Sequence, residues 1–274
     1  TVAYSGFTDI FTYQIRTQQI ERITNDYHDD LDAVAATING EKGILFVSNR
    51  PDTLLENRAL DTILPINTFD VFFYNMSRDV KEFVRVSQTP YVDERHPMPV
   101  NDKYVSYLSN QSGVYNRKMA RLEDFVHHYN QKIILEDGSD IIMHADSSLE
   151  SLDTSLIDTI EYLPVIRQRS ITHTNTNYIS NIALQHTYAS NTNRFVEAIR
   201  APEGLEVYIR ELQPEVRKKV PFTVFQKMRL RRLTGLTPVE EEVEETSSVV
   251  KEVDEPTTKL ITIQEAEAVP DTVD

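Results

Sequence analysis

The chain has 274 residues, carries a formal net charge of −15 at pH 7, and contains neither cysteine nor tryptophan. Without cysteine it has no disulfide framework and no thiolate metal site. No apolar run approaches the roughly 18 residues that a membrane-spanning helix needs. No signal-peptide pattern accompanies Thr1, so we expect the sequence to be an excised piece or a processed product.

Most of the negative charge lies near the C-terminus. Residues 239–274 contain twelve Asp or Glu and two Lys, which leaves about −5 for the other 238 residues. A nearly balanced body gives no indication of nucleic-acid binding, and an acidic tail repels phosphate groups. The tail is also too poor in apolar residues to fold. We therefore predict a folded part over residues 1–233 and a disordered acidic linker over residues 234–274.

The first fifty residues predict short strands joined by turns. Residues 9–15 alternate in period two, with Phe11, Tyr13 and Ile15 on one side. Asn39-Gly40 is a strong hairpin signal because both residues tolerate positive φ. The predicted strands cover residues 2–5, 9–15, 19–24, 32–38 and 44–47, with a polar loop at 25–30.

Segments of this first part recur along the chain. DIFTYQI at residues 9–15 is matched by DVFFYNM at 70–76, and ILFVSN at 44–49 is matched by YVSYLSN at 104–110. Looser copies of the first segment begin at Gly113 and Leu205. Repeats of about 43 residues suit a four-stranded blade of a β-propeller, and longer repeats suit a blade with a loop insertion. The sequence thus predicts an all-β fold, a partial β-propeller of about three to four blades.

These motifs follow one another in an order that resembles the WD40-like (PD40) propeller repeat of TolB-like proteins. That repeat contains LT-N-D, then D-P-A-W-S-P-D-G, then I-A-F-x-S-x-R. The matching segments here are Ile23-Thr24-Asn25-Asp26, Asp32-Ala33 and Phe46-Val47-Ser48-Asn49-Arg50, with a second copy at 86–89, 94–97 and 107–110. Val34 and Asn39-Gly40 depart from the family pattern.

The match covers residues 1–122 and is similar to the large propeller proteins of Bacteroidetes-type cell envelopes. The resemblance implies the C-terminal part of a larger propeller, located in the periplasm or cell envelope, that binds other proteins as a scaffold. It implies no cofactor, and it involves a membrane only indirectly, through other parts of the chain. Two further readings stay open: an accessory propeller that screens substrates for a peptidase, and a carbohydrate-binding propeller.

The middle of the chain is less regular. Residues 132–144 predict a hairpin, with Asp137-Gly138 in its turn. Residues 149–166 fit either a short amphipathic helix or a strand ended by Pro164. The repeat pattern then returns, since residues 170–175 resemble 22–25 and residues 186–191 resemble 44–49.

Two groups of side chains are candidate metal ligands. The loop with Asp26, His28, Asp29, Asp30 and Asp32 offers hard oxygen ligands suited to calcium, although its spacing differs from an EF-hand. The alternative is a solvated loop between strands. The histidines His127, His128 and His144 could meet across a hairpin, but neighbours on a strand point to opposite faces. We predict no bound metal at either place.

Chemical motifs are otherwise scarce. The sequence lacks the nucleophile elbow, the zinc-protease helix motif, the P-loop and the dinucleotide fingerprint, so no catalytic residue is assigned. Glu94-Arg95-His96 could act as an acid–base group because histidine titrates near neutral pH. The alternative is structural, with Arg95 and its neighbours binding backbone carbonyls at the start of a strand.

The strongest candidate for partner binding is a basic segment that alternates with apolar residues. The apolar positions include Phe222, Phe225 and Met228. Such a face can dock on a protein or an anionic surface. The alternative is a closing segment whose charged ends reach into solvent. The basic residues are Arg217, Lys218, Lys219, Lys227, Arg229, Arg231 and Arg232.

Overall fold

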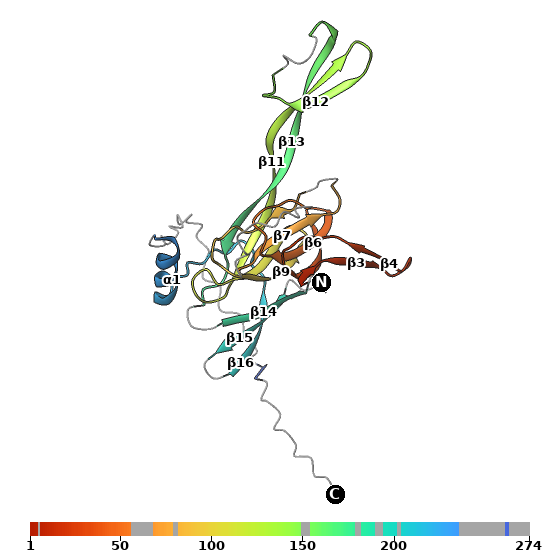
Figure 1. Ribbon diagram of the computed structural model, residues 1–274. Coiled ribbons are helices and arrows are strands. Elements are labelled where there is room, and N and C mark those ends of the chain that lie inside the picture. Colours follow the sequence, from red (N-terminus) through yellow and green to blue (C-terminus); the bar gives the residue numbers. More distant parts are fainter. Residues whose placement is uncertain are drawn as a thin grey trace. The chain divides into compact units, whose positions relative to one another are not determined.

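The computed structural model describes residues 1–4, 6–55, 68–78, 82–148, 154–178, 182–189, 194–201, 204–235 and 261–262. It consists mainly of antiparallel strands (Figure 1), which confirms the predicted all-β class. Clustering of contacts gives two units, Thr1–Arg121 with Thr172–Asp274, and Leu122–Ile171. None of the helical segments in these ranges combines the length and the apolar character required to cross a bilayer.

The first unit contains three sheets, and the strands of each follow one another in chain order. The first sheet has β5 (Asp30–Ile38), β6 (Glu41–Ser48), β7 (Asp70–Asn75) and β8 (Val84–Arg85). The second has β9 (Glu94–Val100), β10 (Tyr104–Ser109), β11 (Asn116–Leu135) and β13 (Ile157–Thr174), with β12 (Asp140–His144) beside the far part of β11. The third has β14 (Ile182–Ala189), β15 (Arg194–Ala201), β16 (Gly204–Glu211) and β17 (Ile261–Thr262).

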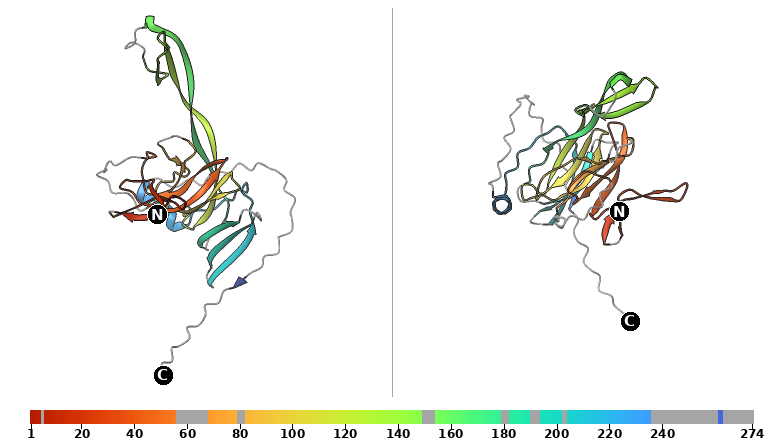
Figure 2. Two further views of the ribbon diagram at one scale, coloured as in Figure 1. Left: turned by 90° about the vertical axis from the view of Figure 1, so that its right-hand side faces the viewer. Right: turned by 45° about the horizontal axis from the view of Figure 1, so that its top comes forward.

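Two hairpins precede the first sheet. They are β1 (Val2–Tyr4) with β2 (Phe7–Asp9), and β3 (Phe11–Gln14) with β4 (Gln19–Arg22). Figure 2 shows these elements and the three sheets from two further directions. Of the predicted linker, the structure describes only residues 234, 235, 261 and 262, and the last two form β17.

The second unit is a ribbon formed by the outer parts of β11 and β13, together with β12. The predicted hairpin is confirmed, since Ile133 pairs with Ile141 and Gly138 takes the positive φ of its turn. The residues from Ile157 onward form β13, so the strand alternative holds there, but the predicted end at Pro164 is wrong because the strand continues to Thr174. A 3-10 turn, η1 (Thr154–Leu156), precedes it, and residues 149–153 lie outside the described residues.

The third and fourth strands of a repeat are joined by one recurring contact. The backbone N–H groups of Ile10, Val71 and Arg117 donate to the hydroxyl oxygens of Thr24, Ser87 and Thr176, at 2.9, 2.8 and 2.8 Å. The carbonyl oxygens of the same three residues accept from the residue before each hydroxyl, at 2.8 Å in every case. We call this contact, found in these three pairs, the hydroxyl clamp. In the third sheet, Glu206 and Val207 pair with Thr262 and Ile261 in the same backbone register.

The clamp confirms the predicted match between residues 23–26 and 86–89 and corrects the later copies. The third copy of the Asp9 segment begins at Asn116 rather than Gly113, and the fourth at Glu206 rather than Leu205. The hydroxyl of the third copy belongs to Thr176, just outside the predicted 170–175 segment. Residues 186–191, predicted to match residues 44–49 of β6, overlap the first strand of the third sheet, β14. The second strand of that sheet, which corresponds to β6, is β15. In the third copy, the long β11–β13 ribbon separates the two halves, so that Asn116 and Thr176 lie 60 residues apart in the sequence.

Both faces of the first sheet contain core residues. On one face, which we call the hairpin face, Ile10 from the β3–β4 region packs with Ile44, Phe46, Phe72 and Phe83. The other face is covered by the second sheet, because β9 packs against β5 and β6. In turn β14 packs against β9, and Phe195 joins Val100, Tyr104, Met119 and Leu212 in a second cluster. The three sheets therefore stack in chain order.

Replacing Thr24 by Val tests the hydroxyl clamp, because it leaves the buried N–H of Ile10 without its acceptor. We expect the free energy of unfolding to fall by about 1–3 kcal/mol. Thr37→Val, on an exposed position of β5, is the matched control and should change it by less than about 0.5 kcal/mol. Equal effects of the two changes in urea unfolding would contradict the clamp.

Candidate functional site

The predicted basic segment contains the helix α1 (Val224–Thr234), which the sequence analysis did not anticipate. Its boundaries have clear local causes. The Thr223 hydroxyl accepts the N–H of Gln226 at 3.2 Å, which caps the first turn. Gly235, with φ 72°, ends the helix by donating its N–H to the carbonyl of Arg231. The signal available in the sequence was Thr223, which lies twelve residues before Gly235.

The helix is fixed to the turn that follows β10. Gln226 is 2% exposed, and the N–H of Thr223 donates to the carbonyl of Ser112 at 2.8 Å. Gly113 allows this approach, since a Cβ there would lie 2.2 Å from the Thr223 hydroxyl oxygen. A larger residue at 113 would therefore displace α1.

The segment before the helix is fixed to the end of β13. The side-chain amide of Asn175 donates to the carbonyls of Gln213 and Val216, each at 2.9 Å. The backbone N–H of Lys218 donates to the carbonyl of Thr174 at 2.8 Å. Hydrogen bonds at several points thus fix the backbone of the segment that carries the basic residues.

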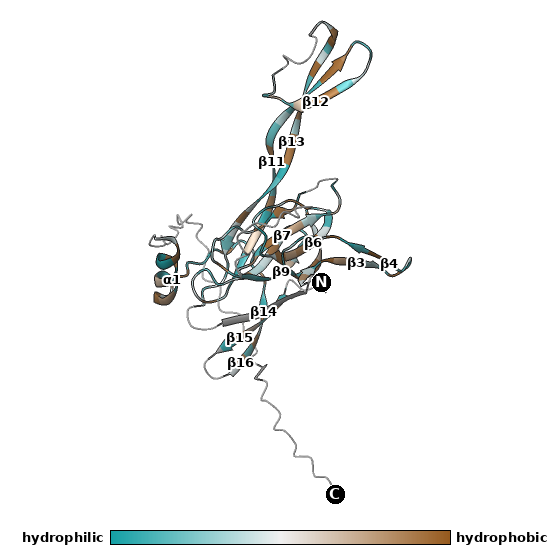
Figure 3. Ribbon diagram, in the orientation of Figure 1, coloured by the Kyte–Doolittle hydropathy of each residue, from teal (hydrophilic) through white to brown (hydrophobic). Residues whose placement is uncertain are grey.

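The outward side of α1 is apolar in its first half and basic in its second. Val224, Phe225 and Met228 are 76%, 76% and 68% exposed, and helical spacing puts them on one side with Arg231 and Arg232 a turn further on. Figure 3 shows both hydrophobic and hydrophilic residues along this helix. Within the described residues, no carboxylate forms an ion pair with Arg229, Arg231 or Arg232. We call the seven basic residues and these three apolar residues the basic surface.

The predicted calcium loop is organised around a buried arginine. One amino group of Arg50 lies 2.7 and 2.9 Å from the two carboxylate oxygens of Asp30 and 3.1 Å from Asp26. Its Nε donates to the Ser48 hydroxyl, and its guanidinium lies 4.5 Å from the centre of the Phe83 ring. Burial raises the pKa of Asp26, while the charge of Arg50 opposes that rise.

Carboxylate oxygens of Asp9, Asp26 and Asp30 lie within 4.8 Å of one another, which is a spacing that metal ligands adopt. Two of these carboxylates contact the guanidinium of Arg50, and Asp9 pairs with Arg22. Arginine therefore supplies the positive charge that a cation would otherwise provide. His28, Asp29 and Asp32 lie outside this cluster, and Asp29 accepts the N–H of Thr8 instead.

The second repeat lacks this arginine. Glu94 pairs with Ser109 across the second sheet, as Asp30 pairs with Ser48 across the first. Arg50 follows Ser48 by two residues, whereas the residue two positions after Ser109 is Gln111. Glu94 is fully buried, and burial raises its pKa to about 7, opposed by hydrogen bonding to Ser87 and by the charge of Lys118. Glu94 is therefore protonated far more readily than an ordinary carboxyl group, whereas its counterpart Asp30 forms an ion pair with Arg50.

The Glu94-Arg95-His96 segment does not assemble into an acid–base group. Glu94 points into the core, whereas Arg95 pairs with Asp93 at 3.7 Å and stacks on Phe69. The N–H of His96 donates to Asp32 at 3.0 Å. The structural alternative for Arg95 holds, with a carboxylate and a ring as partners rather than backbone carbonyls.

The three histidines of the second unit lie closer together than strand alternation predicts. The Nδ1 atoms of His127 and His128 are 2.7 Å apart, and the His128 ring stacks on His144 with 4.7 Å between ring centres. The expectation that the adjacent pair diverges is therefore wrong. The guanidinium of Arg167 lies 3.3 Å from His127 Nε2, which adds a positive charge beside the group.

Removing the guanidinium of Arg50 should leave Asp26 and Asp30 buried without their counter-charge. We expect Arg50→Met to lower the free energy of unfolding by about 3–5 kcal/mol. Arg16→Met, at an exposed position of the β3–β4 turn, is the control and should change it little. A loss below about 1 kcal/mol in urea unfolding would show that the pair contributes no more than a surface ion pair.

Glu94 should make stability depend on pH. Its folded pKa of about 7 exceeds the ordinary 4.5, so its contribution is complete below pH 4.5 and is lost as pH rises to about 7. The loss is roughly 3 kcal/mol. Glu94→Gln stays neutral, so it should match the natural protein near pH 4 and exceed it in stability at pH 8. A difference between the two proteins that is constant across this range would contradict the burial of a carboxyl group here.

Comparison with known proteins gave no match among family models, curated proteins or solved structures. The regularities inside the chain therefore carry the functional argument. They are the hydroxyl clamp, which recurs along the chain, and the basic surface, which occurs once in the described residues and stands on a fixed helix.

Proposed function

We propose that the chain is part of a TolB-like β-propeller that serves as a non-catalytic protein-binding scaffold in the bacterial cell envelope. Three observations support the propeller. Each sheet is a meander of antiparallel strands, the sheets stack in chain order, and the backbone register of the clamp recurs in every sheet. Blades of a propeller have these properties, because each is one repeat of four strands packed on the next.

The basic surface carries the binding proposal. A fixed helix that exposes Phe225 and Met228 keeps large apolar side chains in water, which costs free energy unless a partner covers them. The cations beside them favour a partner with acidic side chains around an apolar patch. Such a face resembles protein interfaces, whose centres are enriched in aromatic residues, methionine and arginine.

The envelope location rests on the resemblance of residues 1–122 to TolB-like repeats. The absence of cysteine suits an oxidising compartment, where a stray thiol forms unwanted disulfides. Neither observation identifies the partner.

A photo-crosslinking amino acid at position 225 tests the binding proposal. In cells that make this protein, we expect one discrete adduct with an envelope protein, because Phe225 is 76% exposed on the basic surface. The matched control is the same amino acid at Ile15, which is 83% exposed on the β3–β4 hairpin. The adduct should disappear when Arg231 and Arg232 are both changed to Glu. Identical adducts at 225 and 15, or none at 225, would refute the proposal.

A further inference from the structure

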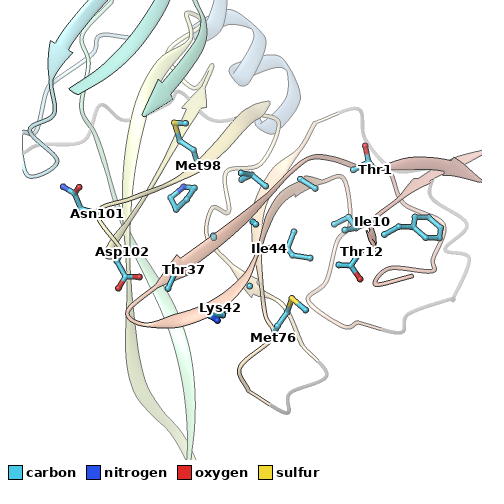
Figure 4. Close-up of a pocket in the computed structure, with 17 residues that line it drawn as sticks. Thr1, Ile10, Thr12, Thr37, Lys42, Ile44, Met76, Met98, Asn101 and Asp102 are labelled. Carbon is cyan, nitrogen blue, oxygen red and sulfur yellow. The ribbon is translucent and has the colours of Figure 1, made fainter. Parts of the chain in front are cut away.

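Apolar side chains outside the basic surface also gather in a hollow and on one face of a sheet. The hollow, of about 940 Å³, lies in the first unit around Ile10, Ile44 and Met76 (Figure 4). Thr1 lines it as well, so its shape depends on the start of the sequence and it indicates no partner. The sheet belongs to the second unit, Leu122–Ile171, far from either end of the sequence. It consists of β12 and the outer parts of β11 and β13 (Figure 1), and we call it the outer sheet.

The register of the outer sheet is fixed on both edges of β11. On one edge, Ile142 of β12 pairs with Lys132. On the other, two backbone hydrogen bonds mark the ends of β13, from Glu136 to the carbonyl of Leu156 and from Asn175 to that of Arg117. Equal numbers of residues separate these bonds on the two strands, so β13 runs beside β11 without a net bulge. Ile160 of β13 therefore stands beside Lys132, in one row with Ile142.

One face of the outer sheet is apolar and open to solvent. Successive residues of a strand point to opposite faces, so the row of Ile142 and Ile160 fixes which side chains share this face. Five of them are large, apolar and at least 36% exposed, namely Val126, Ile142, Ile160, Tyr162 and Ile166. Beside β12 the opposite face is covered, since Ile133 is fully buried and the side-chain amide of Gln131 donates to the carbonyl of Ser147 at 3.1 Å. We call the open side the apolar face.

Carboxylates stand at the outer end of the apolar face. Asp140 of β12 pairs with Ile134 of β11, and the same register puts Asp158 of β13 on the other side of Ile134. Both aspartates are exposed. Residues 130–165 contain eight Asp or Glu and a single cation, Lys132, which lies 3.7 Å from Asp140. The apolar face therefore suits a partner that presents apolar side chains with cations beside them.

The exposed side of helix α1 has these properties in a matching order. Phe225 is exposed in its first turn, and Arg232 is exposed near its end. From Phe225 to Arg232 the helix rises about 10 Å. From Tyr162 to Asp158 the strand rises about 13 Å. A helix lying along β13 can therefore place its aromatic ring on Tyr162 while its arginine reaches the carboxylate.

We propose that the apolar face of the outer sheet is the docking site for helix α1 of a second copy of this chain. Phe225 would lie on Tyr162, and Arg232 would lie beside Asp158. Burial of apolar side chains from both copies provides the free energy, and the opposite charges fix the direction of the helix. Each copy carries both surfaces, so the contact is heterologous and joins copies head to tail into a ring or a filament. The inference rests on the proposed function, since it names the partner of the basic surface.

Two variants of the full chain, each lacking one surface, test the contact. The helix variant Arg231→Glu with Arg232→Glu keeps the apolar face, and the sheet variant Tyr162→Glu keeps the basic surface. In sedimentation velocity the natural chain should self-associate, and each variant should do so at least about tenfold more weakly. An equimolar mixture of the two should form a heterodimer, because the helix of one and the sheet of the other are intact. Ile15→Glu, at an 83% exposed position, is the control and should associate like the natural chain.

The outcomes separate this contact from its alternatives. A natural chain that stays monomeric at about 100 µM would overturn the docking site, whether α1 binds nothing or binds within its own chain. Association that neither variant weakens, or a mixture of variants that stays monomeric, would overturn it too. A monomeric chain whose residue 225 crosslinks to a different protein contradicts the second copy alone, whereas the absence of any adduct at 225 refutes the proposed binding function itself.

Discussion

In the β3–β4 hairpin and in the first two sheets, a buried hydroxyl group holds the fourth strand on the third. The fourth strand is short in the first and third sheets, where β8 and β17 contribute only two residues each. So few ladder bonds hold an edge strand weakly, and a buried backbone N–H without an acceptor costs free energy. The hydroxyl of Thr24, Ser87 or Thr176 provides that acceptor from the side chain. The short edge strand β8 can therefore remain in place on β7.

The repeats share this backbone solution but differ in how they treat buried charge. The first repeat places Arg50 between Asp26 and Asp30, whereas the second leaves Glu94 with hydroxyl groups and a raised pKa. In the third, Arg117 pairs with Glu197, which also accepts from the Tyr178 hydroxyl at 2.5 Å. Breaking a buried pair is costly, and a neutral carboxyl group avoids that cost only below its pKa. The common backbone thus tolerates several electrostatic arrangements.

Much of the fold was predictable from the sequence, since the alternation at residues 9–15, the Asn39-Gly40 and Asp137-Gly138 turns and the repeated Asp-Ile-Phe motif all indicate strands. The second half of the third copy was misplaced because the β11–β13 ribbon separates Asn116 from Thr176 by 60 residues, so a constant repeat length does not locate it. The strand Ile261–Thr262 repeats the Ile23–Thr24 pair, but its acidic surroundings indicated a linker.

The candidate site was only partly predictable. The seven basic residues were recognisable as a group, but helix α1 was not, because its apolar residues do not form a helical stripe along its whole length. Its position depends on contacts distant in sequence, namely Gly113 with Thr223 and Asn175 with Val216. The role of Glu94 depends on the absence of an arginine, which becomes visible only when the two repeats are aligned by their hydrogen bonds.

The most direct test of the repeat architecture is amide hydrogen exchange at the four equivalent residues Ile10, Val71, Arg117 and Val207, measured by NMR on the whole chain. The account predicts protection at all four amides, including Val207, whose fourth strand comes from Ile261 and Thr262. If the amides of Ile10, Val71 and Arg117 are protected but that of Val207 exchanges freely, the third sheet does not share the hydrogen bonding of the other repeats. Free exchange at two or more of the four would contradict the hydroxyl clamp as the common element of the fold.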